Sequence, residues 1–237
     1  MKDLSVMRNR ILSQFAEQSP EAYARFAQSL DPVTFKRGEI LGTAKSRPSH
    51  VYFVDGGIVS LVATTSAGHS LDVAIVGTEG VAGIVDALGA NALPYSWIVQ
   101  LPGTAYRAPT NVVREHILSC SDLHGLLMAY SQSMAHQLTQ SAVCNRFHTA
   151  LQRLARWLLL TSDRAGTCQL ALTHELLAQM VGAPRSAVSQ AAAQLKEDGV
   201  IDYRRGMLTI TNGSRLRASA CECFDLITRA LDAPAGL

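Results

Sequence analysis

The sequence predicts an α+β protein with an N-terminal β-roll (a double-stranded β-helix, or jelly roll), a long helix and a C-terminal winged helix-turn-helix. Three patterns lead to this prediction: closely spaced β-branched and aromatic runs over residues 33–107, a helical apolar period after Pro109, and a helix pair followed by a β-hairpin. A chain of 237 residues is long enough for two domains with separate cores. We expect these domains at residues 1–147 and 148–237.

The composition is that of a globular protein, with 48% apolar and 17% charged residues. The longest uncharged run lies between Asp86 and Arg107, but its Gly and Pro residues would leave backbone groups unpaired in lipid. The first residues carry scattered charges and lack the apolar segment of a secretion signal. We therefore expect a cytoplasmic protein without a membrane partner.

The five cysteines are expected to be reduced thiols, because their number is odd and a chain of this size needs no disulfides. Cys221 and Cys223 form a C-x-C pair, but no Cys or His cluster stands beside it at the spacing of a zinc finger. We therefore predict buried thiols at this pair, with no metal and no other cofactor.

The β-roll is predicted from runs such as HVYFV, GIVSLVATT, LDVAIV and SWIVQL. Residues 55–57 lie between two of these runs, and residues 66–68 follow the second; both segments end in Gly. They are predicted to be hairpin turns, because Gly tolerates the positive φ that such turns require. Many short strands at close spacing indicate a sandwich or barrel.

A long helix over about residues 112–147 is predicted from apolar side chains that recur every three or four positions. Such a stripe can pack on its own domain or against a second copy of the helix, and we favour the dimer interface because the stripe is narrow and the helix long. The stripe consists of Leu123, Leu127, Tyr130, Met134, Leu138 and Ser141.

The helix-turn-helix is predicted from a helix that begins at Thr173 and from the spacing of Ala178, Gly182 and Val188, which suits two helices that cross steeply. In the second helix, apolar residues form an inward stripe. The outward face carries polar side chains that can bond base edges in the major groove of DNA. These side chains are Arg185, Ser186, Ser189 and Gln190.

The segment GVIDYRRGMLTITN predicts a β-hairpin, or wing, with Arg204 and Arg205 at its tip, where they can contact phosphates. Residues 146–217 hold 10 basic and 5 acidic side chains, so the positive charge of the chain is concentrated here. Arg153 and Arg156, on the preceding helix, are expected to be solvated or to face phosphates.

With these motifs, the chain resembles the Crp/Fnr family of bacterial transcription regulators over nearly its whole length. The N-terminal motifs are GEIL, HVYFVDGGIVSLV, VGTEGVAG and VQLPGTAYR, and the C-terminal motif is LTHELLAQMVGAPRSAVSQAAAQLKEDGVIDYRRG. The resemblance implies a cyclic-nucleotide-binding-like roll, a dimer joined through the long helix, and Thr173 and His174 near the DNA backbone. Family members that read the best-known site carry Arg, Glu and Arg where this chain has Arg185, Ser186 and Gln190, so we expect a different operator.

The resemblance also bears on the effector, which the sequence leaves unknown. Members that bind cyclic AMP have a Gly-Glu pair and a following Arg, whereas here Gly83 precedes Ile84 and no cation stands at residues 94–96. Cyclic AMP is therefore not expected in the usual pose. The family's iron–sulfur members hold their cluster with cysteines near the N-terminus. No cysteine precedes Cys120 in this chain, so an iron–sulfur cluster is not expected. The histidines do not support haem; they include His50, His69, His116 and His124.

Two other functions stay open at this point. A β-roll can hold a metal-dependent enzyme, although His50 and His69 lack the H-x-H pair that such enzymes use. A winged helix can also bind protein instead of DNA. We predict a homodimeric, sequence-specific DNA-binding transcription regulator without enzymatic activity, with double-stranded DNA, a second copy of the chain and RNA polymerase as partners and a roughly palindromic operator.

Overall fold

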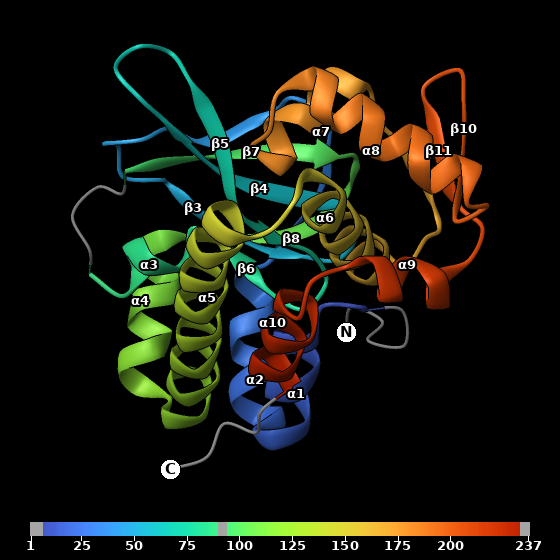
Figure 1. Ribbon diagram of the computed structural model, residues 1–237. Coiled ribbons are helices and arrows are strands. Elements are labelled where there is room, and N and C mark those ends of the chain that lie inside the picture. The colour runs from blue at the N-terminus through green and yellow to red at the C-terminus, as the bar shows by residue number, and fades with distance from the viewer. Residues whose placement is uncertain (1–6, 90–93, 233–237) are drawn as a thin grey trace.

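The computed structural model describes residues 7–89 and 94–232, with the side chains of Asp86 and His174 left out. An N-terminal β-roll lies behind two long helices, and a helix-turn-helix with its wing lies along the top and right of Figure 1. Within the described ranges, the helices lack the combination of length and apolar character that crossing a membrane requires.

The β-roll consists of two four-stranded antiparallel sheets, ordered β1-β8-β3-β6 and β2-β7-β4-β5. The predicted strand runs are confirmed. Their inward positions hold aromatic and branched side chains that are almost fully buried, among them Phe35, Phe53 and Trp97. The strands are β1 (Asp31–Phe35), β2 (Ile40–Gly42), β3 (His50–Val54), β4 (Ile58–Thr64), β5 (Ser70–Val76), β6 (Val81–Ala82), β7 (Tyr95–Leu101) and β8 (Gly103–Pro109).

Short helices that the sequence patterns did not predict cover one end of the roll: α1 (Arg10–Gln18), α2 (Pro20–Phe26), the 3₁₀ helix η2 (Ala27–Ser29) and α3 (Ile84–Ala87). Asn9 positions α1. Its side-chain oxygen accepts from the Leu12 amide, and its side-chain nitrogen donates to the carbonyls of Val54 and Gly80 at 2.8 and 2.9 Å. This side chain thus caps the helix and fixes it to the roll.

The helix predicted over about 112–147 is two helices, α4 (Thr110–Ser119) and α5 (Ser121–Phe147). They meet at Cys120, which has extended backbone angles (φ −135°, ψ 109°) while its N–H bonds the His116 carbonyl. The Ser19 hydroxyl bonds Asp122 in the first turn of α5. The apolar period continues through this break, so the sequence pattern alone did not show it.

The stripe predicted to be a dimer interface faces the protomer's own roll, and that prediction was wrong. Leu123, Leu127, Tyr130 and Met134 belong to the core of the roll domain, and Leu138 packs against it. Ser141 is also buried. The reason is physical: an amphipathic helix beside a sheet buries its apolar stripe on that sheet, and periodicity gives the stripe without its partner.

The C-terminal domain forms most of a second core, to which Ile58, Ile75 and Leu101 of the roll also belong, and it has a three-stranded sheet ordered β10-β11-β9. The helix expected to carry Arg153 and Arg156 is confirmed as α6, with a capping box between Thr149 and Gln152. The elements are α6 (Ala150–Ala165), β9 (Gln169–Ala171), α7 (His174–Val181), α8 (Arg185–Glu197), β10 (Ile201–Arg204), β11 (Met207–Ile210), α9 (Gly213–Ser219) and α10 (Cys223–Asp232).

Helix α10 leaves this domain and packs beside α5, close to α1 (Figure 1). The Ser133 hydroxyl of α5 donates to the Ala230 carbonyl at 2.7 Å, and the Arg10 guanidinium of α1 lies 2.8 Å from the Asp232 carboxylate. Helix α10 therefore returns to the N-terminal domain.

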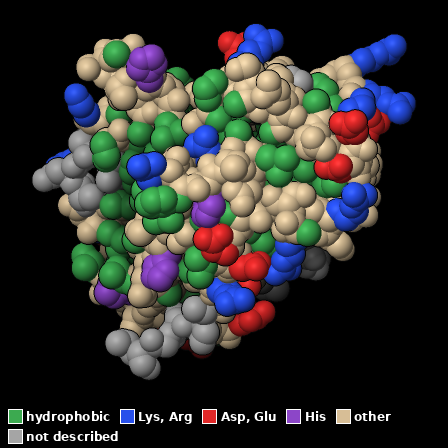
Figure 2. Space-filling view, in the orientation of Figure 1, with side chains coloured by type: hydrophobic (Ala, Val, Ile, Leu, Met, Phe, Trp, Pro, Cys, Tyr) green, Lys and Arg blue, Asp and Glu red, His purple; other side chains and the backbone are tan. Residues whose placement is uncertain are grey.

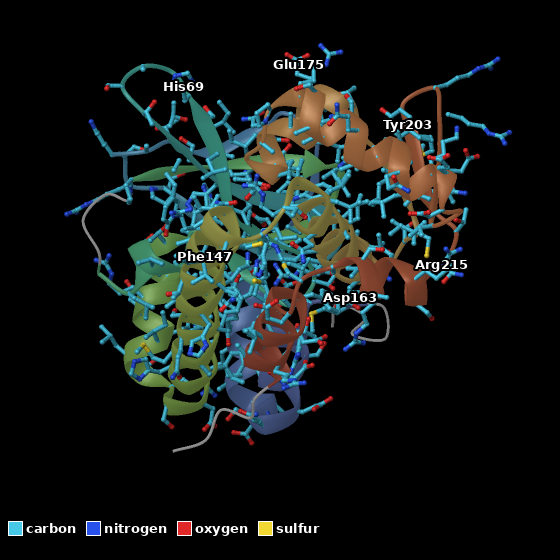
Figure 3. The ribbon with its side chains drawn as sticks, viewed as in Figure 1. His69, Phe147, Asp163, Glu175, Tyr203 and Arg215 are labelled. Carbon is cyan, nitrogen blue, oxygen red and sulfur yellow. The ribbon has the colours of Figure 1, made fainter. Side chains whose placement is uncertain are left out.

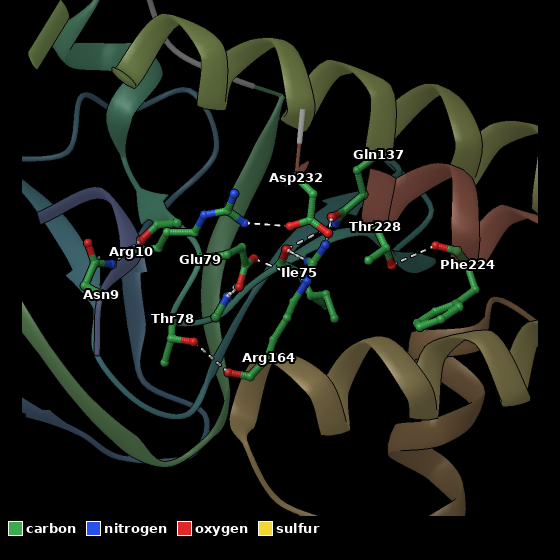
Figure 4. A network of polar contacts seen from close by, with 12 residues as sticks. Asn9, Arg10, Ile75, Thr78, Glu79, Gln137, Arg164, Phe224, Thr228 and Asp232 are labelled. Carbon is green, nitrogen blue, oxygen red and sulfur yellow. Dashed lines mark hydrogen bonds and ion pairs between the residues drawn. The ribbon is translucent and has the colours of Figure 1, made fainter. Parts of the chain in front are cut away.

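A buried network joins the two domains (Figure 4). Arg164 of α6 is only 4% exposed. Its guanidinium donates to the Gln137 side chain of α5 at 2.6 Å and to the Ile75 carbonyl of β5, and it lies 3.3 Å from the Glu79 carboxylate. The Thr78 hydroxyl donates to the Arg164 carbonyl at 3.2 Å. These contacts set the position of α6 relative to the roll.

A second buried polar group at this interface is Asp72 of β5, which accepts from the Ser60 hydroxyl at 2.7 Å. The same hydroxyl approaches the Met180 sulfur of α7. Burial raises the pKa of Asp72 to about 7, although the Ser60 hydrogen bond and the Arg156 guanidinium both oppose the rise. The folded protein therefore holds a proton here that the unfolded chain releases near pH 4.

We expect stability to fall as the pH rises from about 4 to about 7, because over this window the folded state binds a proton that the unfolded state does not. For one proton the slope reaches at most about 1.4 kcal/mol per pH unit. Asp72→Asn should remove this component from the pH dependence of urea unfolding. Asp163→Asn, at an exposed position on α6, is the matched control and should keep it. An unchanged slope in Asp72→Asn would contradict the assignment.

Candidate DNA-binding surface

The turn between α7 and α8 depends on Gly182, as the sequence predicted. Gly182 ends α7 in the left-handed conformation (φ 65°), and its N–H bonds the Ala178 carbonyl. A Cβ added at this glycine would lie 2.4 Å from the Leu71 Cδ1 atom of β5. The Arg153 guanidinium also donates to the Gly182 carbonyl at 3.2 Å. The turn of the helix-turn-helix therefore packs directly on the roll.

The two faces of α8 are as predicted. Val188, Ala191, Ala192 and Leu195 are buried in the core of the C-terminal domain. The side chains expected to reach bases lie on the opposite side, near the N-terminus of the helix. Arg185, Ser186 and Gln190 are exposed, and Ser189 is half-buried.

Helix α7 begins as predicted. The Thr173 hydroxyl accepts from the Leu176 amide at 3.2 Å and caps the helix, and Thr173 itself is exposed. His174 is the first residue of α7, but its side chain lies outside the described part of the structure. Figure 3 shows Glu175, the next residue, at the outer side of α7.

The wing is the hairpin of β10 and β11, whose turn is Arg205 and Gly206. Both have positive φ, 49° and 80°, which matches the twist of a tight hairpin. Arg204 and Arg205 are exposed at the tip, and the Arg204 Nε atom lies 2.7 Å from the Asp202 carboxylate. The Tyr203 hydroxyl donates to the Leu172 carbonyl at 2.6 Å, which holds the wing beside the segment that leads into α7.

The basic side chains of this domain divide into surface and interior groups. Figure 2 shows Lys and Arg side chains gathered around the wing at the upper right. The expectation that Arg153 and Arg156 are solvated or face phosphates was wrong: Arg156 is 7% exposed, and Arg153 is half-buried against the Gly182 turn and the Asn145 side chain. Both lie on the side of α6 that faces the rest of the protein.

His50 and His69, the two histidines of the roll, lie in different environments. His50 is half-buried beside the Ser49 hydroxyl, at 2.8 Å, whereas His69 is exposed on the β4–β5 hairpin (Figure 3). Ile84, which stands where cyclic-AMP-binding relatives carry Glu, is 1% exposed. Among the described residues, the group able to hold a metal is elsewhere, at Cys144, His148, Cys221 and Cys223.

Residues 152–219 match the model of the Crp-like helix-turn-helix domain. This match contains α7, α8 and the wing, and the roll with its following helices precedes it. The chain is a Crp/Fnr-type DNA-binding transcription regulator. All eight predicted DNA-contacting residues, from Thr173 to Arg205, fall inside the matched segment.

Relatives of this Crp/Fnr-type regulator are distant in sequence. A global nitrogen regulator of Nostoc sp. strain PCC 7120 is 24% identical over 187 residues, which are 75% of this chain and 83% of that protein. The structure of FixK2 from Bradyrhizobium japonicum is similar with a TM-score of 0.70 and 17% identity, over 81% of this chain and 98% of that one. The structure of a CRP/FNR family regulator from Thermus thermophilus is similar with a TM-score of 0.60 and 22% identity, over 80% of this chain and 98% of that one.

Gly182→Ala should destabilise the regulator by more than Gly199→Ala does. Both glycines have nearly the same positive φ, 65° and 67°, so both variants lose about 1 kcal/mol to backbone strain. Only at Gly182 does the new methyl group meet a neighbour, Leu71, since nothing lies within 4 Å at Gly199. Urea unfolding measures both variants. Adding Leu71→Ala should recover part of the Gly182→Ala loss, and equal losses in the two single variants would contradict the contact.

Proposed function

We propose that this regulator works as a homodimer that reads a roughly palindromic operator, with α8 in the major groove and the wing on the flanking backbone. The observation that carries the proposal is the exposed N-terminal end of α8, where Arg185, Ser186 and Gln190 project from a domain that also exposes the arginines of the wing. Arg can bond guanine through two atoms and Gln can bond adenine in the same way, whereas the wing arginines suit phosphates.

The outward face of α5 supports the dimer. Eight of its exposed residues recur at alternating spacings of four and three, which is the seven-residue period of a two-helix interface. Most are small, so two helices could approach closely. Exposed hydrophobic side chains also lie along α4 and α5, where Figure 2 shows green and purple side chains. The residues of this outward stripe are Ser121, Gly125, Met128, Gln132, Ala135, Thr139, Ala142 and Arg146.

A dimer with a two-fold axis along α5 would present two copies of α8, and operators of such dimers have half-sites about 34 Å apart. We further propose that the roll does not bind cyclic AMP in the usual pose, because the buried Ile84 side chain offers no group to hold a ribose. We also propose that the regulator works in the cytoplasm and that, when bound to its operator, it acts on RNA polymerase.

The DNA-binding proposal is tested by selecting random duplexes on the purified protein and titrating the selected site at several salt concentrations. We expect a two-fold-symmetric site and an affinity whose logarithm falls linearly with the logarithm of the salt concentration. Selection of no site, together with weak binding that does not depend on salt, would favour a winged helix that binds protein.

Arg185→Ala should weaken binding to the selected site by about 1–3 kcal/mol and relax discrimination at one base pair in each half-site. Arg205→Ala should weaken binding to selected and random duplexes alike, because phosphate contacts carry no sequence information. Arg215→Ala, exposed on α9 and away from α8 (Figure 3), is the control and should bind normally. Equal losses on both duplexes for Arg185→Ala would contradict the assignment.

Ala135→Arg should convert the dimer into a monomer, because two-fold symmetry would place two guanidinium groups at the same interface. Light scattering after gel filtration should give half the mass, and affinity for the symmetric site should fall at least tenfold. Ala24→Arg, at an exposed alanine on α2, is the matched control and should remain dimeric. A dimeric Ala135→Arg variant would show that another face forms the interface.

A further inference from the structure

Four side chains with metal-binding chemistry meet where α5 ends and α10 begins. Cys144 and His148 stand four positions apart at the end of α5, Cys221 precedes α10, and Cys223 is its first residue. One ligand atom from each lies within 4.8 Å of all the others. The three cysteines are buried and form a cluster of their own, and His148 is half-buried. Figure 3 shows sulfur atoms between α5 and α10, near Phe147.

The distances suit a tetrahedral metal ion. The sulfur atoms of Cys144 and Cys221 are 3.6 Å apart, and the Cys223 sulfur lies 3.4 Å from the His148 Nδ1 atom. Zn²⁺ binds thiolate sulfur at about 2.3 Å and imidazole nitrogen at about 2.0–2.1 Å, so tetrahedral geometry separates two sulfurs by about 3.8 Å and a sulfur from a nitrogen by about 3.6 Å. The side chains thus need to move by only a few tenths of an ångström in these two pairs.

The groups around the cluster also fit a bound cation. The His148 Nε2 atom lies 3.3 Å from the Glu222 carboxylate, an arrangement that leaves Nδ1 free to face the metal and raises the basicity of the ring. The Gln140 side-chain N–H donates to the Cys223 sulfur at 3.1 Å. The buried Arg156 guanidinium acts electrostatically on Cys144. Three thiolates and one Zn²⁺ sum to a single negative charge, which Arg156 would balance.

We propose that Cys144, His148, Cys221 and Cys223 form a structural zinc site that holds the start of α10 against the end of α5. Four protein ligands complete the coordination of Zn²⁺ and leave no position for a substrate, as in structural sites. Soft thiolates with one imidazole select zinc over magnesium or calcium, which prefer oxygen ligands.

The position of the site gives it a mechanical consequence. His148 is two residues from the first residue of α6, so the metal lies at the junction between the roll domain and the DNA-binding domain. It joins the end of α5 to a segment 77 residues further along the chain. Bound zinc therefore restricts how far the C-terminal domain can move relative to α5.

The first test is the metal content of the full-length protein, purified under reducing conditions from medium that contains zinc. Plasma mass spectrometry should find about one zinc per chain. Replacement of zinc by Co²⁺ should give the visible d–d bands of a tetrahedral ion and the near-ultraviolet charge-transfer band of thiolate ligands. Cys221→Ser and Cys223→Ser should lose both signals. Cys120→Ser and Cys168→Ser, which change the two thiols outside the cluster, should keep them.

A variant that removes no ligand separates metal binding from folding. Glu222→Gln leaves all four ligands in place but weakens the carboxylate partner of His148. Competition with a chromophoric chelator should show zinc affinity reduced by about 10- to 100-fold. Circular dichroism of the zinc-loaded variant should match that of the unmodified protein.

Three results would overturn the proposal. The first is a protein with less than about 0.1 zinc per chain that gives no tetrahedral Co²⁺ spectrum on reconstitution. The second is iron and sulfide in place of zinc, with the absorption of an iron–sulfur cluster. The third is a Cys144–Cys221 disulfide in the protein purified under reducing conditions, seen by peptide mass spectrometry, since its sulfurs would close to about 2.05 Å and could not both bind the ion.

Discussion

The buried guanidinium of Arg164 determines how the two halves of this regulator are arranged. A charge that is removed from water is tolerated only when its hydrogen bonds are satisfied and its charge is paired. Arg164 meets this requirement with groups from β5, from the turn after β5 and from α5, that is, Ile75, Glu79 and Gln137. None of these belongs to the DNA-binding domain. The domain that carries α8 is therefore held against the roll by a contact that few other orientations could satisfy.

Helix α5 connects the parts of the protein because its three faces have different partners. Its apolar stripe completes the core of the roll, and a second face receives α10 through Ser133 and Gln140. The third face is exposed and has the seven-residue period of a helix pair. A helix with 3.6 residues per turn can offer all three faces at once. Any change in the position of α10 or of the roll would therefore reach the proposed dimer interface through a single rigid element.

The positive charge of the C-terminal half serves two purposes. Arg153, Arg156 and Arg164 are turned toward the rest of the protein. Arg153 bonds the Gly182 turn, Arg156 acts electrostatically on the buried Asp72, and Arg164 pairs with Glu79. Arg185, Arg204 and Arg205 are exposed on α8 and the wing. Net charge therefore overstates the surface available to phosphates, since an arginine contributes to DNA binding only where its guanidinium reaches solvent.

The sequence by itself determined the local structure: the strand runs of the roll, the turn at Gly182, the inward and outward faces of α8, and the hairpin at Arg205 and Gly206. These features follow from side-chain period, turn chemistry and capping, which act over a few residues. The break at Cys120 and the partner of the stripe that includes Leu127 did not follow, because periodicity shows that a face is apolar and not what covers it.

Only the tertiary structure decided which distant residues meet. Arg156 could be assigned to the interior only once α6 was placed on the roll, and burial of a charge depends on that placement. From the sequence, only the pair Cys221 and Cys223 was considered, and buried thiols without a metal were expected there. Cys144 and His148, four positions apart at the end of α5, were not recognised as possible ligands. The return of α10 to α5 brings Cys221 and Cys223 to Cys144 and His148. A metal site requires four atoms to converge in space, and convergence across 77 residues is a property of the fold.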